Sequence, residues 1–269
     1  MRRSLFIHLI VAVLFTRHLK MIHRHPVNIR ISPRTVALMF TLSLLPAPTR
    51  AQEPTSKRHV ADADGLVQQL DLSNTNYEHG VGSITWTGTV ASHTDCSGFI
   101  DQLLMHDDGY TADQFKRWFG IRRPTAATYH DAIASAHGFT QVLTVPELQL
   151  GDVIAIKYLT RHDNTGHIML VVGKPKRVAS SAPIVDGTTQ WEIDIIDSSE
   201  SGHGPSDTRH KRGVDGKDHD GLGRGVFRVY TLGAGEMAGF TWSTLKSSRF
   251  VTPDAEHLLM GRFVPGFAP

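Results

Sequence analysis

Apolar positions in the stretch that follows residue 63 recur with the spacing of helices. Over 97–106, Phe99, Ile100 and two leucines one turn later share one apolar stripe, and Asp101 faces outward. The same spacing predicts helices over 111–118 and over 125–136, the second of which follows Pro124. Each of these helices would bury one face and expose the other.

Beyond Gly151 the pattern changes to short apolar runs, partly alternating with polar positions, which are typical of strands. The predicted strands cover 152–157, 167–173, 190–197, 225–231 and 239–243. Helices that come first and strands that follow, without regular alternation, predict an α+β fold with a central antiparallel sheet.

Two apolar runs, 5–15 and 36–47, open the chain, and each is shorter than the ~20 residues of a membrane-spanning helix. The second run follows a basic stretch and ends in prolines and small residues at Ala51, which is the order of a signal peptide. We therefore expect a leader over 1–51, cleaved after Ala51, a true start at Met21, and an exported protein of the periplasm, the cell envelope or the exterior. A membrane anchor made of both runs is the alternative.

Residues 52–63 are polar and predict a linker, and 64–269 suit one domain with a sizeable core. The chain has 28 Lys and Arg against 26 Asp and Glu, but eight basic and no acidic residues fall in 1–51, which leaves a net charge of −6 for the rest. A nucleic-acid binder needs its basic excess on the folded surface, so this class is excluded. We expect a monomer without a stable membrane span once the leader is removed.

One segment, 201–225, is rich in glycine and charge and predicts a long loop between strands. Its Gly-Leu-Gly-Arg-Gly end is no dinucleotide-binding fingerprint, because no predicted strand precedes it and no helix follows. Four aspartates of the segment are candidate Ca²⁺ ligands, although their spacing matches no established pattern: Asp207, Asp215, Asp218 and Asp220. A solvated, flexible loop is the simpler interpretation.

Cys96 is the single cysteine of the chain, so it cannot form an intramolecular disulfide and is either buried filler or a reactive group. It stands at the start of the helix predicted over 97–106, on the inward-facing stripe. The free N–H groups and the partial positive charge of a helix start stabilise a thiolate, and the N–H groups can receive an oxyanion. Cys96 is therefore the candidate nucleophile, with a structural cysteine as the alternative.

A thiolate nucleophile needs a base within hydrogen-bond reach, and His167 is the best placed of the sixteen histidines. It opens an apolar run that predicts a buried strand, and Gly166 before it permits close approach of another backbone or of a substrate. His162, His203 and His210 lie in polar segments and are weaker candidates. A histidine that only fills the core or the sheet edge is the alternative.

Asp197 ends the strand predicted over 190–197 and lies on its apolar face. If this strand pairs antiparallel with 167–173, the first residue of one strand lies near the last residue of the other, and Asp197 would orient His167. A carboxylate on an inward face also needs such a partner. The alternative is an aspartate that caps a turn after the strand.

Three segments resemble the NlpC-type cell-wall peptidases of the papain-like cysteine amidase superfamily: Asp-Cys-Ser-Gly-Phe around Cys96, Leu-Gly-Asp-Val-Ile at 150–154 and Gly-His-Ile-Met-Leu-Val-Val-Gly at 166–173. The resemblance covers about 75–200 and implies a papain-like fold in which the nucleophile helix packs on the sheet. It gives Cys96 the role of nucleophile, His167 that of base and Asp197 that of the orienting residue, where the family more often has His, Asn or Gln. The family also has a tyrosine before the cysteine motif. Tyr77, although farther upstream, is therefore a candidate for substrate contact.

The activity implied by the resemblance is that of an exported cysteine amidase or peptidase that cleaves an amide bond, in the peptide stem of peptidoglycan, without a cofactor. Acyl transfer by the same three residues is not separated from hydrolysis. A non-catalytic envelope or peptidoglycan-binding protein on the same scaffold is a further alternative. A metal site of His93, Cys96 and His167 is another, although no fourth ligand is evident.

Overall fold

A computed structural model describes residues 55–71, 73–161, 164–212, 219–233 and 235–269. The predicted leader over 1–51, its cleavage after Ala51 and the start at Met21 lie outside these residues, as do the candidate Ca²⁺ ligands Asp215 and Asp218. No helix of the described part is both long and apolar enough to cross a membrane.

Within the described residues, four helices come before most of the strands: α3 (Thr55–Gln69), α4 (Cys96–Asp108), α5 (Ala112–Phe119) and α6 (Ala126–Ala134). The last three begin at a side-chain cap, because Asp95, Thr111 and Thr125 each accept a hydrogen bond from a free N–H of the first turn. Glycines in the left-handed conformation end α4 and α5. These local signals explain why the three predicted helices are confirmed.

The prediction of a linker over 52–63 is wrong from Thr55 onward, where α3 begins. The helix packs on α4 and buries Val60, Ala63 and Leu66. This apolar stripe continues past residue 63, so its helical period is visible only when the polar stretch and the following residues are taken together.

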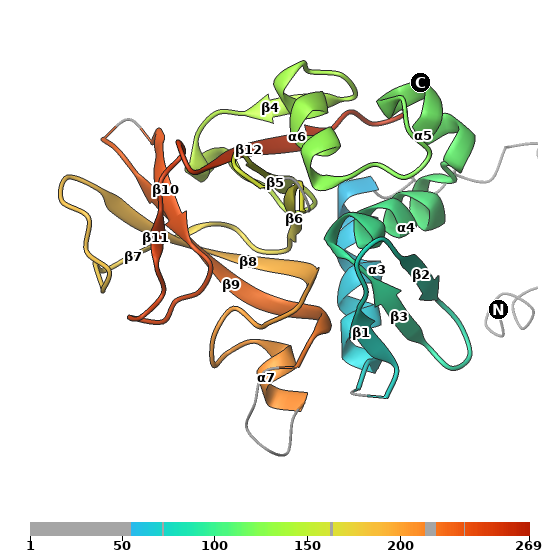
Figure 1. The fold of residues 1–269 in the computed structure, drawn as a ribbon, viewed down its shortest axis with the longest axis horizontal. Helices are drawn as coiled ribbons and strands as arrows, with labels where there is room; N and C mark the ends of the chain where they lie inside the picture. The colour runs from blue at the N-terminus through green and yellow to red at the C-terminus, as the bar shows by residue number, and fades with distance from the viewer. Residues whose placement is uncertain (1–54, 72, 162–163, 213–218, 234) are drawn as a thin grey trace, which may run out of the picture. The chain divides into compact units, whose positions relative to one another are not determined.

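The strands of the second half form a nine-stranded antiparallel sheet in the order β11-β10-β9-β8-β6-β5-β12-β4, with β7 paired to β8 (Figure 1). This confirms the α+β class and the antiparallel sheet. The strands are β4 (Phe139–Val142), β5 (Val153–Tyr158), β6 (Gly166–Val171), β7 (Lys176–Val178), β8 (Thr189–Ser199), β9 (Gly221–Thr231), β10 (Met237–Thr241), β11 (Phe250–Val251) and β12 (Glu256–Phe263). A short 3₁₀ helix, η2 (Val145–Glu147), lies between β4 and β5.

A second, three-stranded sheet leads into α4 and lies beside it in Figure 1. It consists of β1 (Thr75–Tyr77), β2 (Gly82–Thr85) and β3 (Ala91–Thr94). β3 pairs parallel with β1 and antiparallel with β2, so the hairpin of 82–94 returns the chain to the side of β1. The residue that follows β3 is Asp95, which caps α4.

The central strands are buried on both faces and contribute alternate residues to two cores. Val153 and Leu170 face the helices, whereas Ile154 and Met169 face a second apolar cluster built with β9 and β10. His167 has the parity of Met169, and Asp197 has the parity of the second-core residues of β8. Both side chains therefore belong to the face of the sheet that lies away from the helix core.

The segment 201–225 is not a loop throughout, which corrects the sequence prediction. It contains a short helix, α7 (Thr208–Arg212), and its last five residues are already part of β9 (Figure 1). The glycines at the start of β9 explain why this part of the strand was not predicted, because residues without side chains give no alternation of apolar and polar positions.

Asp101 is also placed differently from the prediction, since it is buried and not turned outward. The Tyr129 hydroxyl donates a 2.7 Å hydrogen bond to its carboxyl group. α4 packs against α3 and against strands of both sheets, and the side chain of Tyr129 on α6 reaches Asp101. Burial raises the pKa of Asp101 to about 8, although the Tyr129 hydrogen bond acts in the opposite direction.

Candidate active site

Cys96 is the first residue of α4, as the sequence predicts, and it is nearly buried. The cap before it is Asp95, whose carboxylate accepts a 2.7 Å bond from the N–H of Gly98 and a 2.9 Å bond from the N–H of Gly80. Arg123 donates a further 2.7 Å bond to the same carboxylate. Burial acts to raise the pKa of Asp95, but these hydrogen bonds outweigh it and keep that pKa below its usual range.

Gly98 in the cysteine motif lets α4 approach the small sheet closely. A Cβ atom at this position would lie 2.4 Å from the carbonyl oxygen of Val81 and 3.0 Å from Cα of Gly82. Only glycine permits this distance without a backbone shift. The close approach fixes the start of α4, and with it the sulfur, against the strand that follows Tyr77.

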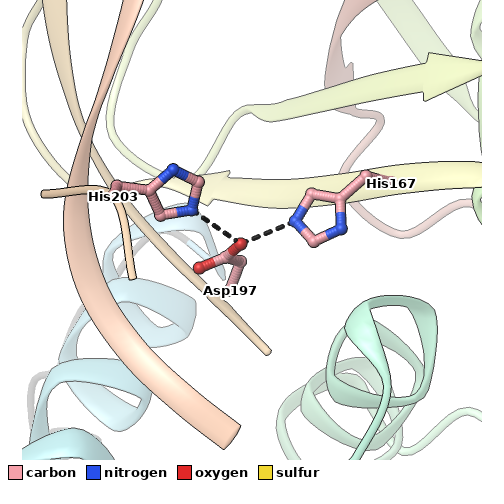
Figure 2. Close-up of side chains that lie close together, drawn as sticks. All are labelled: His167, Asp197 and His203. Atoms are coloured by element: carbon pink, nitrogen blue, oxygen red, sulfur yellow. Dashed lines mark hydrogen bonds and ion pairs between the residues drawn. The ribbon is translucent and has the colours of Figure 1, made fainter. Parts of the chain in front are cut away.

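His167 lies at the start of β6, where its ring joins two groups. Its Nε2 is 2.6 Å from Oδ2 of Asp197, and the ring also makes a hydrogen bond with Cys96. Because Nε2 is engaged by the carboxylate, the nitrogen that faces the sulfur is Nδ1. Figure 2 shows Nδ1 on the side of the ring turned away from Asp197.

The electrostatic surroundings of His167 favour its charged form. Burial alone would lower its pKa, but the charge of Cys96 and the hydrogen bonds to Asp197 and Cys96 raise it to about 10. The ring is therefore an imidazolium at neutral pH. A cationic ring beside a thiol is the arrangement that stabilises a thiolate.

Gly166 permits the close backbone approach expected from the sequence. It has a positive φ of 153°, and a Cβ atom there would lie 1.9 Å from the carbonyl oxygen of Ile156 on β5. The glycine thus lets β6 begin tight against β5, and this sets the height of His167 at the sheet edge.

Asp197 is fully buried inside β8, two residues before the strand ends. β6 and β8 pair antiparallel as predicted, with Leu170 opposite Ile196. Continuing this register places Asp197 opposite Met169, so it meets His167 as a diagonal neighbour on the same face. The alternative of a turn cap is wrong, because the strand continues to Ser199.

Two further basic side chains contact this carboxylate. Figure 2 shows the ring of His203 beside Oδ2 of Asp197. Its Nε2 lies 3.0 Å from this oxygen, and Nη2 of Arg209 donates a 2.8 Å bond to Oδ1. Burial acts to raise the pKa of Asp197, but Arg209, His203 and His167 hold it well below its usual range. Asp197 is thus a carboxylate under all ordinary conditions.

Trp242 covers the two histidines from the side of β10. Its ring lies edge-to-face against His167, with 5.3 Å between the ring centres, and 6.5 Å from the ring of His203. Its carbonyl oxygen accepts a hydrogen bond from Nδ1 of His203. The tryptophan therefore shields the contact between His167 and Asp197 from water.

Two tyrosines lie within electrostatic reach of the sulfur. The residues between Tyr77 and the cysteine motif form the β2–β3 hairpin, and the parallel pairing of β1 with β3 brings Tyr77 beside Thr94. Burial raises the pKa of both Tyr77 and Tyr158, and the charge of Cys96 raises it further. Tyr158, at the end of β5, carries the guanidinium of Arg161 over its ring at 4.6 Å.

Of the metal sites weighed from the sequence, the set of His93, Cys96 and His167 does not form among the described residues. His93 is hydrogen-bonded to Asn76 of β1, and its ligand atoms do not cluster with those of Cys96 and His167. Asp207, a candidate Ca²⁺ ligand, is paired with Arg209 at 2.8 Å. Ligand atoms of His167, Asp197 and His203 do lie within 4.8 Å of one another, but Arg209 already neutralises that carboxylate.

The fold and the site define a papain-like protein with a cysteine at a helix start and a histidine at the edge of an antiparallel sheet. A model of the NlpC/P60 family matches residues 82–190. "Uncharacterized protein R653" of Acanthamoeba polyphaga mimivirus is 33% identical over 212 residues, which cover 73% of this chain and 92% of that protein. The chain belongs to the NlpC/P60 family, whose members are generally cysteine peptidases or hydrolases acting on peptide or amide substrates. No solved structure matches it.

The structure brings Cys96, His167 and Asp197 together and adds residues that the sequence did not single out for this role. The sequence makes His203 only a weak candidate for the base and Asp207 a candidate Ca²⁺ ligand, and no pattern points to Arg209. In the structure, His203 and Arg209 contact Asp197. A polar, glycine-rich segment predicts solvated charges, and only the three-dimensional pairing shows that these charges are buried. The family match ends at residue 190, so it includes Cys96 and His167 but not Asp197, His203, Asp207 or Arg209.

Proposed function

We propose that the protein is a cysteine amidase or peptidase in which Cys96 is the nucleophile, His167 the proton carrier and Asp197 the residue that orients His167. The observation that carries this proposal is the position of the His167 ring, which binds Asp197 through Nε2 and Cys96 through its other nitrogen. Nucleophile, base and orienting group in one hydrogen-bonded series are what acyl transfer by a thiol requires.

The reaction begins with the thiolate of Cys96 and the imidazolium of His167. The sulfur attacks the amide carbonyl carbon, and backbone N–H groups at the start of α4 stabilise the oxyanion. As the C–N bond breaks, His167 gives its proton to the leaving amine nitrogen. His167 then takes a proton from water, whose oxygen attacks the thioester. The acid departs, and the thiolate and imidazolium are restored.

For the substrate, we propose an amide bond in the peptide stem of peptidoglycan, acted on by an exported protein of the periplasm, the cell envelope or the exterior. Support comes from the family and from the order of basic, apolar and small residues in 21–51. Tyr77 and Tyr158 are proposed to contact the substrate, because both lie near the sulfur and neither is fully buried.

The test is digestion of purified peptidoglycan with the wild-type protein and with Cys96→Ala, followed by mass spectrometry of the fragments. New fragments from the wild type alone support the proposal. Equal patterns from both proteins reject this substrate. His106→Gln is a suitable control, because His106 stacks on Trp86 at the far end of α4 from the sulfur.

Two further measurements separate the alternatives. Cys96 is the only cysteine, so iodoacetamide labels a single site and its rate reports the thiolate directly. Slow labelling near neutral pH would indicate a non-catalytic envelope protein. Addition of a primary amine during digestion would convert the fragment acids into amides if the protein is an acyltransferase.

A further inference from the structure

The segment between β8 and β9 contributes three buried polar side chains, of which His203 and Arg209 contact the carboxylate of Asp197. His203, Asp207 and Arg209 are 3%, 0% and 0% exposed. All three lie beyond the region matched by the family model. Buried ionic groups are costly unless each finds partners, so their contacts show what this segment is built to hold.

All five N–H groups of Arg209 have an acceptor, which is the full capacity of a guanidinium. Nη2 donates 2.8 Å bonds to Oδ1 of Asp197 and to Oδ2 of Asp207, and Nε donates a 2.9 Å bond to Oδ1 of Asp207. Nη1 donates to the carbonyl oxygens of Asp197 and Gly221, at 3.3 and 3.2 Å. Arg209 thus fixes both the side chain and the backbone of Asp197.

His203 has an acceptor at each ring nitrogen. Nε2 faces Oδ2 of Asp197, and Nδ1 faces the carbonyl oxygen of Trp242. These two contacts fix the orientation of the His203 ring between the carboxylate of Asp197 and the backbone of Trp242.

The buried ionisable groups of this segment are paired with one another. Asp197 contacts Arg209, His167 and His203, and Asp207 contacts Arg209. Asp207 also accepts bonds from the backbone N–H groups of His203 and Arg209, at 2.9 and 2.8 Å, and so holds the segment in its folded form. This pairing explains how these groups can be buried together.

The glycines of the following strand make room for this arrangement. Gly223, which lies opposite Asp197 on β9, would place a Cβ atom 2.6 Å from Nε of Arg209. A Cβ atom at Gly225 would lie 2.3 Å from Oδ2 of Asp207 and 2.8 Å from Cβ of His203. The Gly-Leu-Gly-Arg-Gly motif, which fits no nucleotide site, thus provides the space in which His203, Asp207 and Arg209 pack.

We infer that His203 and Arg209 are positioning residues of the active site: they hold Asp197 in the one orientation that aims His167 at Cys96. This inference rests on the proposed function. Oδ2 of Asp197 contacts both His167 and His203, so the segment 203–209 sets the direction of the His167 ring through Asp197. This segment lies beyond the region that the family model matches.

The test compares His203→Gln, Arg209→Gln and Arg209→Lys with the wild type. We measure kcat, KM, the pH dependence of iodoacetamide labelling at Cys96, and thermal unfolding. We expect kcat to fall by about 10²-fold in His203→Gln and Arg209→Gln, the cost of an ångström-scale misplacement, with little change in KM. The acid limb of the labelling profile should move to higher pH, because a displaced Asp197 favours the imidazolium of His167 less, and the thiolate of Cys96 is then stabilised less. Arg209→Lys, which keeps the positive charge, should recover part of kcat and part of the labelling profile.

Arg228→Gln is the matched control, since Arg228 is also buried but donates to the carbonyl oxygens of Ala182 and Thr244 and not to Asp197. It should lower stability without moving the labelling profile. If Arg209→Gln does not fold, Gly225→Ala and His203→Gln test the same contact. A folded His203→Gln protein with wild-type kcat and labelling profile overturns the inference. A wild-type protein that neither labels rapidly nor hydrolyses overturns the proposed function instead.

Discussion

The Ser198 hydroxyl donates a 2.6 Å hydrogen bond to the carbonyl oxygen of Thr94, and both residues are completely buried. Ser198 follows Asp197 on β8, and Thr94 precedes the cap of α4 by one residue. The bond therefore joins the strand of the orienting carboxylate to the chain that carries the nucleophile, across 104 residues of sequence. It therefore helps to set the distance between Asp197 and Cys96, together with the packing of α4 on β6 and β8.

Ser198→Ala should lower the free energy of unfolding by only about 1 kcal/mol, because the Thr94 oxygen keeps its bond from the N–H of Glu78. Catalysis should suffer more, by up to about 10²-fold in kcat, since the sulfur and the imidazole lose their shared anchor. Denaturant unfolding and steady-state kinetics measure the two effects. Ser199→Ala on the same strand serves as control, and a loss of stability without loss of kcat would argue against the anchor.

The protonation of His167 predicts the alkaline side of the pH profile. Its pKa of about 10 in the folded protein exceeds the usual value of 6.5, so the imidazolium persists through neutral pH and is lost as the pH rises through about 10. Because the leaving amine takes its proton from this ring, kcat should be level from about pH 7 to 9 and fall near pH 10.

The charge of Cys96 is the largest of the effects that raise this pKa. Cys96→Ala should therefore lower the pKa of His167, which NMR titration of the ring protons measures. The ring of His106, stacked on Trp86, provides the internal reference. An unchanged His167 titration in Cys96→Ala would show that the thiolate and the imidazolium are not paired.

Trp242 should protect the bond between His167 and Asp197, because its ring covers both histidines of the site. Trp242→Ala admits water to this bond and weakens it, since hydrogen bonds of charged groups are stronger at low dielectric. We expect kcat to fall and stability to drop by about 3 kcal/mol, as the ring also packs on Phe227 and Phe240. Trp242→Phe keeps the apolar cover and should retain most of kcat; equal losses in both variants would assign the effect to packing alone.

The central strands and the helix of Cys96 could be predicted from the sequence because their signals are local. The apolar runs of β5 and β6, the cap Asp95 and the glycine before His167 each act within a few residues. The α+β class followed from their order along the chain. The parity of one strand placed Asp197 on the apolar face, and the antiparallel pairing of β6 with β8, which the sequence alone left as a condition, brings it to His167.

The missed elements depend on contacts between distant parts of the chain. β12 lies near the C-terminal end of the sequence and pairs with both β5 and β4. The small sheet contains the parallel pair β1 and β3, which no local sequence pattern predicts. Arg209 and His203 were missed because a buried charge and a solvated charge look alike in sequence. Their burial follows only from the carboxylates that neutralise them.

Asp101 supplies a test of stability that is independent of catalysis. Its pKa is about 8 in the folded protein against 3.8 ordinarily, so between these values the folded protein holds a proton that the unfolded chain has lost. Stability must then fall as the pH rises from about 4 to about 8, by up to about 1.4 kcal/mol per pH unit, and level off above. Asp101→Asn keeps an oxygen that accepts the Tyr129 hydroxyl but removes the titration.

This variant should therefore lose that slope and be more stable than the wild type at pH 8, as measured by denaturant unfolding at several pH values. Asp113→Asn is the matched control, because Asp113 is a surface carboxylate paired with Arg122 on the outer face of the protein. It should leave the slope unchanged. Identical slopes in the wild type and Asp101→Asn would mean that Asp101 is ionised in the folded protein. The Tyr129 hydrogen bond and the nearby Arg123 would then outweigh the cost of its burial.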